Sequence, residues 1–194
     1  MNVACVEADK LGGVCLNIGC IPTKALLSSA LLVIEIKEGE QHGIRAEGLT
    51  FELGPAQERS RRIAQQMERG IAGLFKKNKI THMQGRGRLA RRGMVEVGSD
   101  GKKTLVQAKH IILATGSRPK DLPFLKIDED RVISSTGALM LNKAPATLAV
   151  VGAGAVGVEF ADVFNAYGTK VTIIEALDRI LPLEDSDCSA VVEK

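Results

Sequence analysis

The chain has 194 residues, 45% hydrophobic and 25% charged, a composition typical of folded globular proteins and not of disordered ones. A formal net charge of +3 is too small for a nucleic-acid-binding surface, and the longest apolar stretches are too short, or too rich in glycine and serine, to span a bilayer. We therefore expect no nucleic-acid partner and no membrane. A cytoplasmic location is expected because no basic segment followed by an apolar one opens the chain.

The first half of the chain is predicted to contain a strand, two helices, a small sheet and a further strand. Residues 3–7 predict a short buried strand that is already under way at the first residue, so the chain looks cut at this end. An apolar helix follows the cysteine-containing segment and ends near residue 36, and a second helix is predicted over about 56–77. Short runs broken by glycine and charge pairs predict a small antiparallel β-meander over 80–106, and residues 110–114 predict a buried strand.

The second half contains a strand–helix–strand unit. Prolines and an acidic run mark a connecting segment, after which residues 148–151 predict a strand, 154–167 a helix and 171–175 another strand. This order is the βαβ unit of a parallel sheet.

These elements predict an α/β fold with two Rossmann-like dinucleotide-binding domains and a small antiparallel β-meander. The first domain covers residues 1–120, lacks its first strand and carries the cysteine pair. Residues 121–145 connect it to the second domain, 146–194, which is incomplete at its C-terminal end.

Gly152, Gly154 and Gly157 fit the pattern G-x-G-x-x-G between the strand and the helix of this unit. The first glycine permits a tight turn, the second lets the backbone approach a pyrophosphate, and the third lets helix and strand pack closely. With Ala155 and Val156, they place backbone N–H groups at a helix N-terminus, where phosphates bind. The alternative is a plain turn between strand and helix that binds no ligand.

Glu175 ends the strand that follows this motif and can accept two hydrogen bonds from a ribose diol. Its carboxylate would repel the 2′-phosphate of NADP, and Arg179 is the single nearby arginine that could neutralise that phosphate. We therefore predict NAD as the nucleotide.

Cys15 and Cys20 are five positions apart. On a regular helix their Cα atoms would lie about 8.5 Å from each other, beyond the limit of about 7 Å for a disulfide. A bridge therefore requires a distorted backbone, for which Gly19 supplies the freedom. Pro22 suits a first helical turn, so Cys20 is predicted at a helix N-terminus, close to Lys24, where a thiolate is favoured.

Two other interpretations of the cysteines compete with a redox pair. The first is a pair of structural thiols in a buried turn. The second is a zinc site, which has little support because the remaining cysteines and the three histidines show no paired ligand spacing. We expect no metal.

Residues 12–24, with the sequence GGVCLNIGCIPTK, closely resemble the redox-active segment of the pyridine-nucleotide disulfide oxidoreductases. Within that family the chain looks most like the members that oxidise dihydrolipoamide. The resemblance runs through essentially the whole chain, including residues 114–119, the glycine motif and residues 175–182. The glutathione and mercuric reductases share this architecture but normally prefer NADP, against which Glu175 weighs.

The resemblance implies a role for each matching residue. Cys15 would exchange with the dihydrolipoyl sulfur, and Cys20 would contact the flavin of FAD. Lys24 would sit beside the flavin and pair with Glu159. The residues implied in FAD binding are Glu7, Gly12, Gly13, Val14, Lys24, Gly87, Ala114, Thr115 and Gly116. Those implied in NAD binding are Gly152, Gly154, Ala155, Val156, Gly157 and Glu175. Electrons would pass from dihydrolipoamide to the disulfide, then to FAD and then to NAD.

Three parts of the family pattern find no match here: the glycine-rich phosphate loop that should precede Glu7, a late His–Glu pair that handles the thiol proton, and a C-terminal domain that forms the dimer interface. We therefore expect an internal fragment that is inactive alone. The implied partners are the lipoyl domain of a 2-oxo acid dehydrogenase or glycine cleavage complex, and a second copy in a homodimer. Two other functions stay open: a non-catalytic NAD-binding module with structural cysteines, and a redox-switch thiol protein without flavin.

Overall fold

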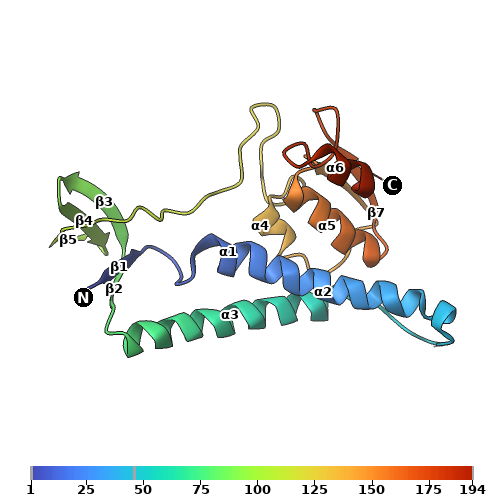
Figure 1. Cartoon of the computed structure of the whole chain (residues 1–194), viewed down its shortest axis with the longest axis horizontal. Coiled ribbons are helices and arrows are strands. Elements are labelled where there is room, and N and C mark those ends of the chain that lie inside the picture. Colours follow the sequence, from blue (N-terminus) through green and yellow to red (C-terminus); the bar gives the residue numbers. More distant parts are fainter. Residues whose placement is uncertain (1, 46, 194) are drawn as a thin grey trace. The chain divides into compact units, whose positions relative to one another are not determined.

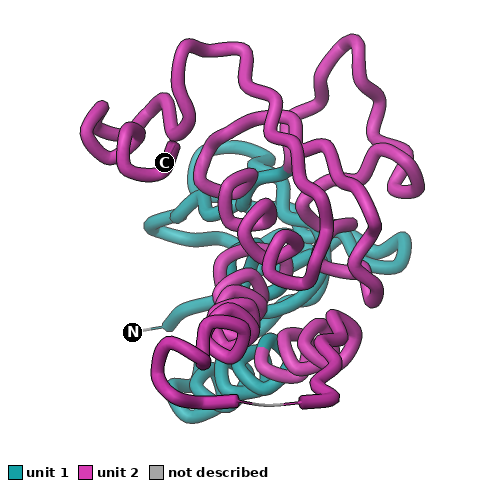
Figure 2. Tube along the Cα trace, turned by 90° about the vertical axis from the view of Figure 1, so that its right-hand side faces the viewer, with its two compact units in different colours: residues 1–17, 64–118 teal, residues 18–63, 119–194 magenta. Residues whose placement is uncertain are grey.

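The computed structural model describes residues 2–45 and 47–193, which form two compact units (Figure 2). Unit 1 comprises residues 2–17 and 64–118. Unit 2 comprises residues 18–45, 47–63 and 119–193. The architecture is mixed α/β, with three small sheets among the described residues.

Unit 1 holds two of the sheets (Figure 1). Strand β1 (Ala4–Glu7) pairs in parallel with β2 (Thr81–Gln84). Strands β3 (Arg86–Arg91), β4 (Met94–Ser99) and β5 (Lys102–Gln107) form an antiparallel sheet in the order β3-β4-β5, which confirms the predicted meander. Unit 1 also holds most of helix α1 (Gly13–Ile18) and the C-terminal part of α3 (Leu53–Lys77).

Two details of the predicted unit 1 are wrong. The meander does not begin at residue 80, because residues 81–84 pair with β1, an extended neighbour that the local pattern could not reveal. Residues 110–114 form no strand: Ile112 is 90% exposed and Leu113 is 68% exposed. An apolar run becomes a buried strand only where a neighbouring strand supplies hydrogen-bond partners, and none of the described strands pairs with it.

Unit 2 contains a parallel two-stranded sheet and most of the helices. Strand β6 (Thr147–Val151), helix α5 (Ala155–Ala166) and strand β7 (Lys170–Ile174) form the predicted strand–helix–strand unit, with β6 and β7 paired in parallel. The other elements are α2 (Cys20–Lys37), the 3₁₀ helix η1 (Gly39–His42), the N-terminal part of α3, α4 (Ser135–Ala138) and α6 (Ser186–Val192).

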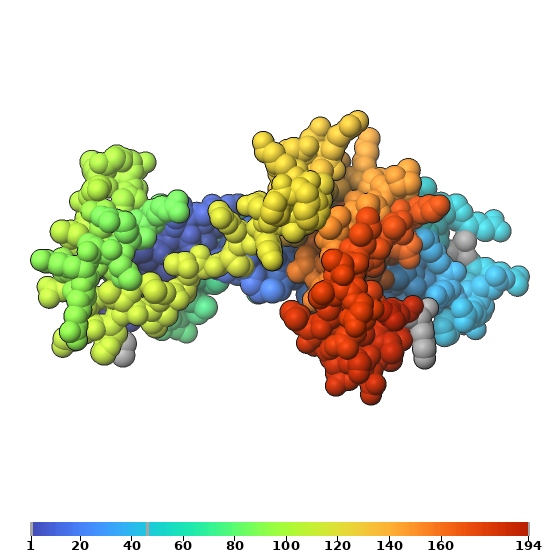
Figure 3. Space-filling view, turned by 90° about the horizontal axis from the view of Figure 1, so that it is seen from above, coloured from blue at the N-terminus to red at the C-terminus, as the bar shows by residue number. Residues whose placement is uncertain are grey.

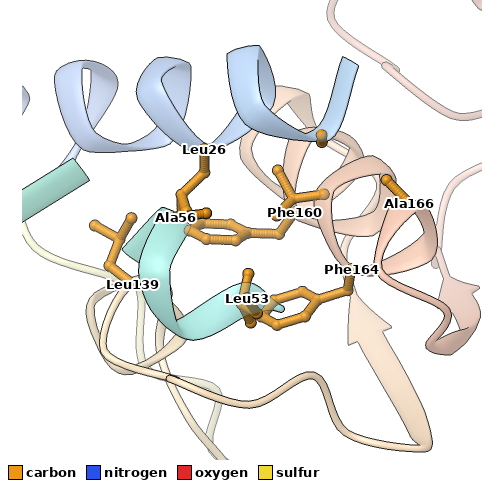
Figure 4. Packing of buried hydrophobic residues seen from close by; sticks show 9 residues of the cluster. Leu26, Leu53, Ala56, Leu139, Phe160, Phe164 and Ala166 are labelled. Carbon is orange, nitrogen blue, oxygen red and sulfur yellow. The ribbon is translucent and has the colours of Figure 1, made fainter. Parts of the chain in front are cut away.

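The core of unit 2 lies where α2, α3, α4 and α5 meet (Figure 4). Phe164 is 1% exposed and packs with Phe160, whose ring centroid lies 6.3 Å away. Leu26 on α2 and Leu139 beside α4 complete the apolar cluster, and Ala30, with no exposed surface, keeps α2 close to its neighbours. Burial of these side chains attaches the cysteine-bearing helix α2 to α5, the helix that follows the glycine motif.

Residues 13–37, which run through α1 and α2, are long and apolar enough to cross a membrane by length and composition. Soluble core helices meet the same criterion. Here Leu26, Ala30 and Val33 are buried in the protein, and the helix is interrupted at Gly19, whose φ is −140° and ψ is −119°. These contacts identify α2 as a core helix of unit 2.

Candidate functional site

The glycine motif forms a tight turn between β6 and α5. Gly152 has a φ of +102°, a conformation that favours glycine, and its N–H donates to Ile174 O at 2.8 Å. A Cβ at Gly157 would overlap the carbonyl oxygen of Gly152, so the third glycine is required for α5 to lie against β6. A Cβ at Gly154 would meet no protein atom within 4 Å, which leaves open space over the turn.

Glu175 follows β7, and its carboxylate binds three backbone N–H groups. Its Oε2 accepts from Ala153 at 2.7 Å, and its Oε1 accepts from Ala176 at 2.7 Å and from Leu177 at 3.0 Å. These bonds, led by that from Ala153, lower the pKa of Glu175 because they stabilise the charged carboxylate. The carboxylate therefore lies at the glycine turn, as the ribose-binding prediction requires, but it already has protein partners there.

Arg179 lies in the loop between β7 and α6. Its Nη2 donates to the carbonyl oxygens of Pro182 at 3.4 Å and Glu184 at 3.1 Å. The guanidinium is thus engaged in shaping its own loop. This arrangement does not favour a second role in neutralising a 2′-phosphate.

The two cysteines of the predicted pair lie on either side of a break in the helix. Cys15 lies in α1, and Cys20 is the first residue of α2, whose N-cap is Gly19. Both side chains are exposed. The interruption at Gly19 confirms that the backbone between them is not a regular helix, and Cys20 lies at a helix N-terminus as predicted.

The other two cysteines differ from this pair. Cys5 lies in β1 and is partly buried; burial first, and the nearby Glu7 carboxylate second, raise the pKa of its thiol. Both effects keep this thiol protonated at neutral pH. Cys188 lies on α6, is exposed, and forms no disulfide among the described residues.

Sequence reasoning missed Asn17, which fixes the loop before Cys15. Its side chain is buried, and Nδ2 donates to the carbonyl oxygens of Leu11 at 3.1 Å and Gly13 at 3.0 Å. Gly12 and Gly13 both have positive φ in this loop. The sequence shows an asparagine four positions after Gly13, but only the fold shows that its amide is buried and binds the carbonyl groups of this turn.

Lys24 and Glu159 form an ion pair within unit 2. Lys24 lies one turn into α2, and Glu159 lies in the second turn of α5. The lysine side chain is 61% exposed and the glutamate 27% exposed, so water still reaches the pair. The contact that the family resemblance implied is present, and it joins the helix of Cys20 to the helix of the glycine motif.

The residues predicted to bind FAD fall, apart from Lys24, in unit 1. Glu7 ends β1, and its Oε1 accepts from the Asp9 N–H at 2.8 Å. A Cβ at Gly87 would lie 3.4 Å from Val6 in β1, and one at Gly116 would lie 3.1 Å from Val14. Unit 1 thus brings Gly87 to β1 and Gly116 to the start of α1. Ala114 and Thr115 lie in the exposed segment after β5.

A surface hollow of about 410 Å³ lies on unit 1, between β2 and the meander. None of the predicted site residues lines it. His82, at its edge, makes an edge-to-face contact with Phe75, which accounts for this histidine as a packing residue.

A family model described as "Pyridine nucleotide-disulphide oxidoreductase" matches residues 1–194. The chain belongs to this family of pyridine nucleotide-disulphide oxidoreductases. Among its curated relatives, the dihydrolipoyl dehydrogenase of Chlamydia pneumoniae is 42% identical over 193 residues, which cover 99% of this chain and 41% of that protein. The leghemoglobin reductase of Glycine max is 40% identical over 190 residues, which cover 96% of this chain and 36% of that protein.

Solved structures show the same fold. LpdA from Mycobacterium tuberculosis matches with a TM-score of 0.89 at 26% identity, covering 99% of this chain and 42% of that one. The flavoprotein disulfide reductase RclA from Escherichia coli matches with a TM-score of 0.81 at 29% identity, covering 98% of this chain and 40% of that one. The chain spans about two fifths of the length of these relatives.

Proposed function

We propose that this chain belongs to a flavoprotein that oxidises protein-bound dihydrolipoamide and passes the electrons, through a cysteine pair and FAD, to NAD. The observation that carries the proposal is the arrangement within unit 2. Cys20 begins α2, Lys24 lies one turn further on, and Lys24 is paired with Glu159 on the helix of the glycine turn. One packed unit therefore holds a thiol suited to be a thiolate, a fixed ammonium group and a nucleotide-type turn.

The proposed thiol chemistry balances in electrons and protons. One substrate thiolate attacks Cys15 Sγ of a Cys15–Cys20 disulfide, and Cys20 leaves as a thiolate. The second substrate thiol then attacks the substrate sulfur that is bonded to Cys15. Its proton goes to the departing Cys15 sulfur, so the lipoyl disulfide forms, Cys15 becomes a thiol and Cys20 stays a thiolate. The N-terminal end of α2 stabilises negative charge on Cys20, and Lys24 adds a positive charge one turn away.

The residues of unit 1 fit FAD in their conformation. Gly12, Gly13 and Gly116 have positive φ, so the backbone turns there without side chains, and Glu7 ends a parallel strand, the position of ribose-binding carboxylates. These residues, with Val14, Gly87, Ala114 and Thr115, would hold FAD. FAD, when bound, supplies a two-electron acceptor that can pass electrons on to NAD.

The second glycine turn fits a dinucleotide in the same way. Gly154 leaves open space above the first turn of α5, and the N–H groups of Ala155, Val156 and Gly157 belong to that turn. They would hold the NAD pyrophosphate. We propose Rossmann-like domains at residues 1–120 and 146–194, joined by 121–145, and a homodimeric cytoplasmic enzyme that acts on a lipoyl domain.

Differential alkylation with mass spectrometry tests the cysteine pair. The folded chain is alkylated before and after reduction, and Cys5 and Cys188 serve as internal controls. We expect Cys15 and Cys20 to become reactive only after reduction. Full alkylation of both without reductant would refute the redox pair.

Absorbance spectroscopy and nucleotide titration separate the alternative functions. Flavin absorbance, with a long-wavelength band on reduction, and NAD binding support the proposal. NAD binding without flavin or cysteine redox chemistry would instead identify a nucleotide-binding module. Disulfide exchange with neither cofactor would identify a redox-switch thiol protein.

A further inference from the structure

The peptide of Ala153, in the middle of the glycine turn, is held from both sides by residues that follow β7. Its N–H donates to Glu175 Oε2 at 2.7 Å, and its carbonyl oxygen accepts from the Leu181 N–H at 2.8 Å. Ala153 has no exposed surface. Two hydrogen bonds from residues of this chain therefore hold the middle of the turn.

Glu175 has little capacity left for a ligand. A carboxylate offers about four acceptor positions, and three are taken by the N–H groups of Ala153, Ala176 and Leu177. A ribose diol has two hydroxyl donors. Only one of them can bond to Glu175 unless a backbone bond is first broken.

The loop that carries Leu181 is itself fixed. Leu181 has a φ of +47°, a conformation that is uncommon for a leucine and persists only where neighbouring groups hold it. Arg179 supplies that support through the carbonyl oxygens of Pro182 and Glu184. The loop lies on the surface of unit 2, in the red part of the chain in Figure 3.

We infer that Glu175 is a positioning residue for the glycine turn. With the loop around Arg179 and Leu181, it sets the nucleotide-binding conformation of residues 152–154 before the ligand arrives, and it contacts the ribose through one hydrogen bond and not two. The inference rests on the proposed binding of NAD at this turn. It separates two roles of one carboxylate, bracing the turn and recognising the sugar.

Amide hydrogen exchange of the nucleotide-free chain, followed residue by residue by NMR, tests whether the hydrogen bonds from Glu175 to the backbone hold the turn; we call these bonds the brace. Ala176 is an exposed residue whose N–H donates to Glu175 Oε1, so slow exchange of its amide reports on that bond. We compare the wild type with Glu175→Gln, which keeps the side-chain length, and Glu175→Asp, which keeps the charge but is one methylene shorter. Glu184→Gln is the matched control, since the Glu184 carboxylate makes no hydrogen bond among the described residues.

Loss of these charge-assisted bonds is expected to speed exchange at Ala153 and Ala176 by about tenfold or more in both Glu175 variants. The control is expected to match the wild type. Unchanged exchange in both Glu175 variants, or rapid exchange of Ala176 in the wild type, would overturn the brace; the wild-type measurement holds even if a variant does not fold.

Titration with NAD and NADP separates the inference from the proposed function. If Glu175 mainly braces the turn, Glu175→Asp loses NAD affinity as Glu175→Gln does, although it retains the charge that repels a 2′-phosphate. If Glu175→Asp keeps full NAD affinity and selectivity, the brace has no role in binding and the inference fails. If no protein binds NAD, the proposed function fails, and the exchange data still decide whether Glu175 holds the turn.

Discussion

Two glycines of the same motif should respond differently to the addition of one methyl group: one variant should lose stability and the other should lose NAD affinity. In Gly157→Ala the new Cβ overlaps the carbonyl oxygen of Gly152 and lies 3.2 Å from Val150 Cγ1. A peptide oxygen cannot rotate away as a side chain can, so α5 has to move off β6. In Gly154→Ala the new Cβ meets nothing within 4 Å, and the φ of −72° suits alanine.

The magnitudes follow from these surroundings. Overpacking costs about 1–3 kcal/mol, and for a chain of this size each kcal/mol lowers Tm by about 2–4 °C, so a cost of about 2 kcal/mol lowers the Tm of Gly157→Ala by about 4–8 °C. In Gly154→Ala, alanine is a poorer N-cap than glycine but restricts the unfolded chain, and these effects of about 0.5–1 kcal/mol offset each other.

Thermal unfolding followed by circular dichroism, with calorimetric titration of NAD, measures both effects. Gly157→Ala is expected to lose stability, and Gly154→Ala is expected to keep its Tm while losing NAD affinity, because the methyl group occupies the space above the turn. A wild-type Tm for Gly157→Ala would refute the close packing of α5 on β6. Undiminished NAD binding by Gly154→Ala would show that the pyrophosphate does not occupy that space.

Three further predictions concern the core, the cysteine loop and pH. Phe164→Ala should lower the free energy of unfolding by about 3–5 kcal/mol in urea titrations, whereas Phe124→Ala, at a side chain that is 82% exposed, should change it little; equal effects would contradict the core assignment. Asn17→Ala should cost about 1–3 kcal/mol because two carbonyl groups lose their donor, and the exposed Asn78→Ala is its control. The pKa of the Glu175 carboxyl is lower in the folded state than in the unfolded state. The ionised carboxylate therefore stabilises the fold above its ordinary pKa, and this contribution is lost as the pH falls through the folded-state pKa. In Glu175→Gln this part of the fall in the free energy of unfolding at acid pH should be absent.

The elements that could be predicted from sequence are those whose partners lie nearby in the chain. The strand–helix–strand unit around Gly152 forms from consecutive residues, and its glycine spacing encodes the tight turn directly. The meander likewise pairs neighbouring segments. In both cases the periodicity of the side chains and the glycines at the turns were enough to predict that the element forms.

Features that depend on distant residues could not be predicted in this way. Strand β2 pairs with β1, more than seventy positions earlier in the chain. The apolar residues 111–114 are exposed because none of the described strands pairs with them. At the candidate site, the sequence placed Glu175 at the end of a strand but could not show its bonds to three backbone N–H groups. Hydrogen bonding to the backbone depends on the path of the chain and not on residue type.

Among the described strands, β3 and β5 are the two edges of the meander of unit 1, and an edge strand carries backbone groups that no neighbouring strand of its own sheet pairs. Both edges are basic: β3 carries Arg86, Arg88 and Arg91, and β5 carries Lys102 and Lys103, all exposed (Figure 3, light green). Glu96 on β4 pairs with Arg88 at 3.2 Å and with Lys103 at 3.3 Å, so repulsion between two copies that meet edge to edge depends mainly on Arg86, Arg91 and Lys102. Since salt screens exposed charges over about 10 Å at 0.1 M, this protection weakens as ionic strength rises. Concentrated salt is therefore expected to favour intermolecular strand pairing at these edges.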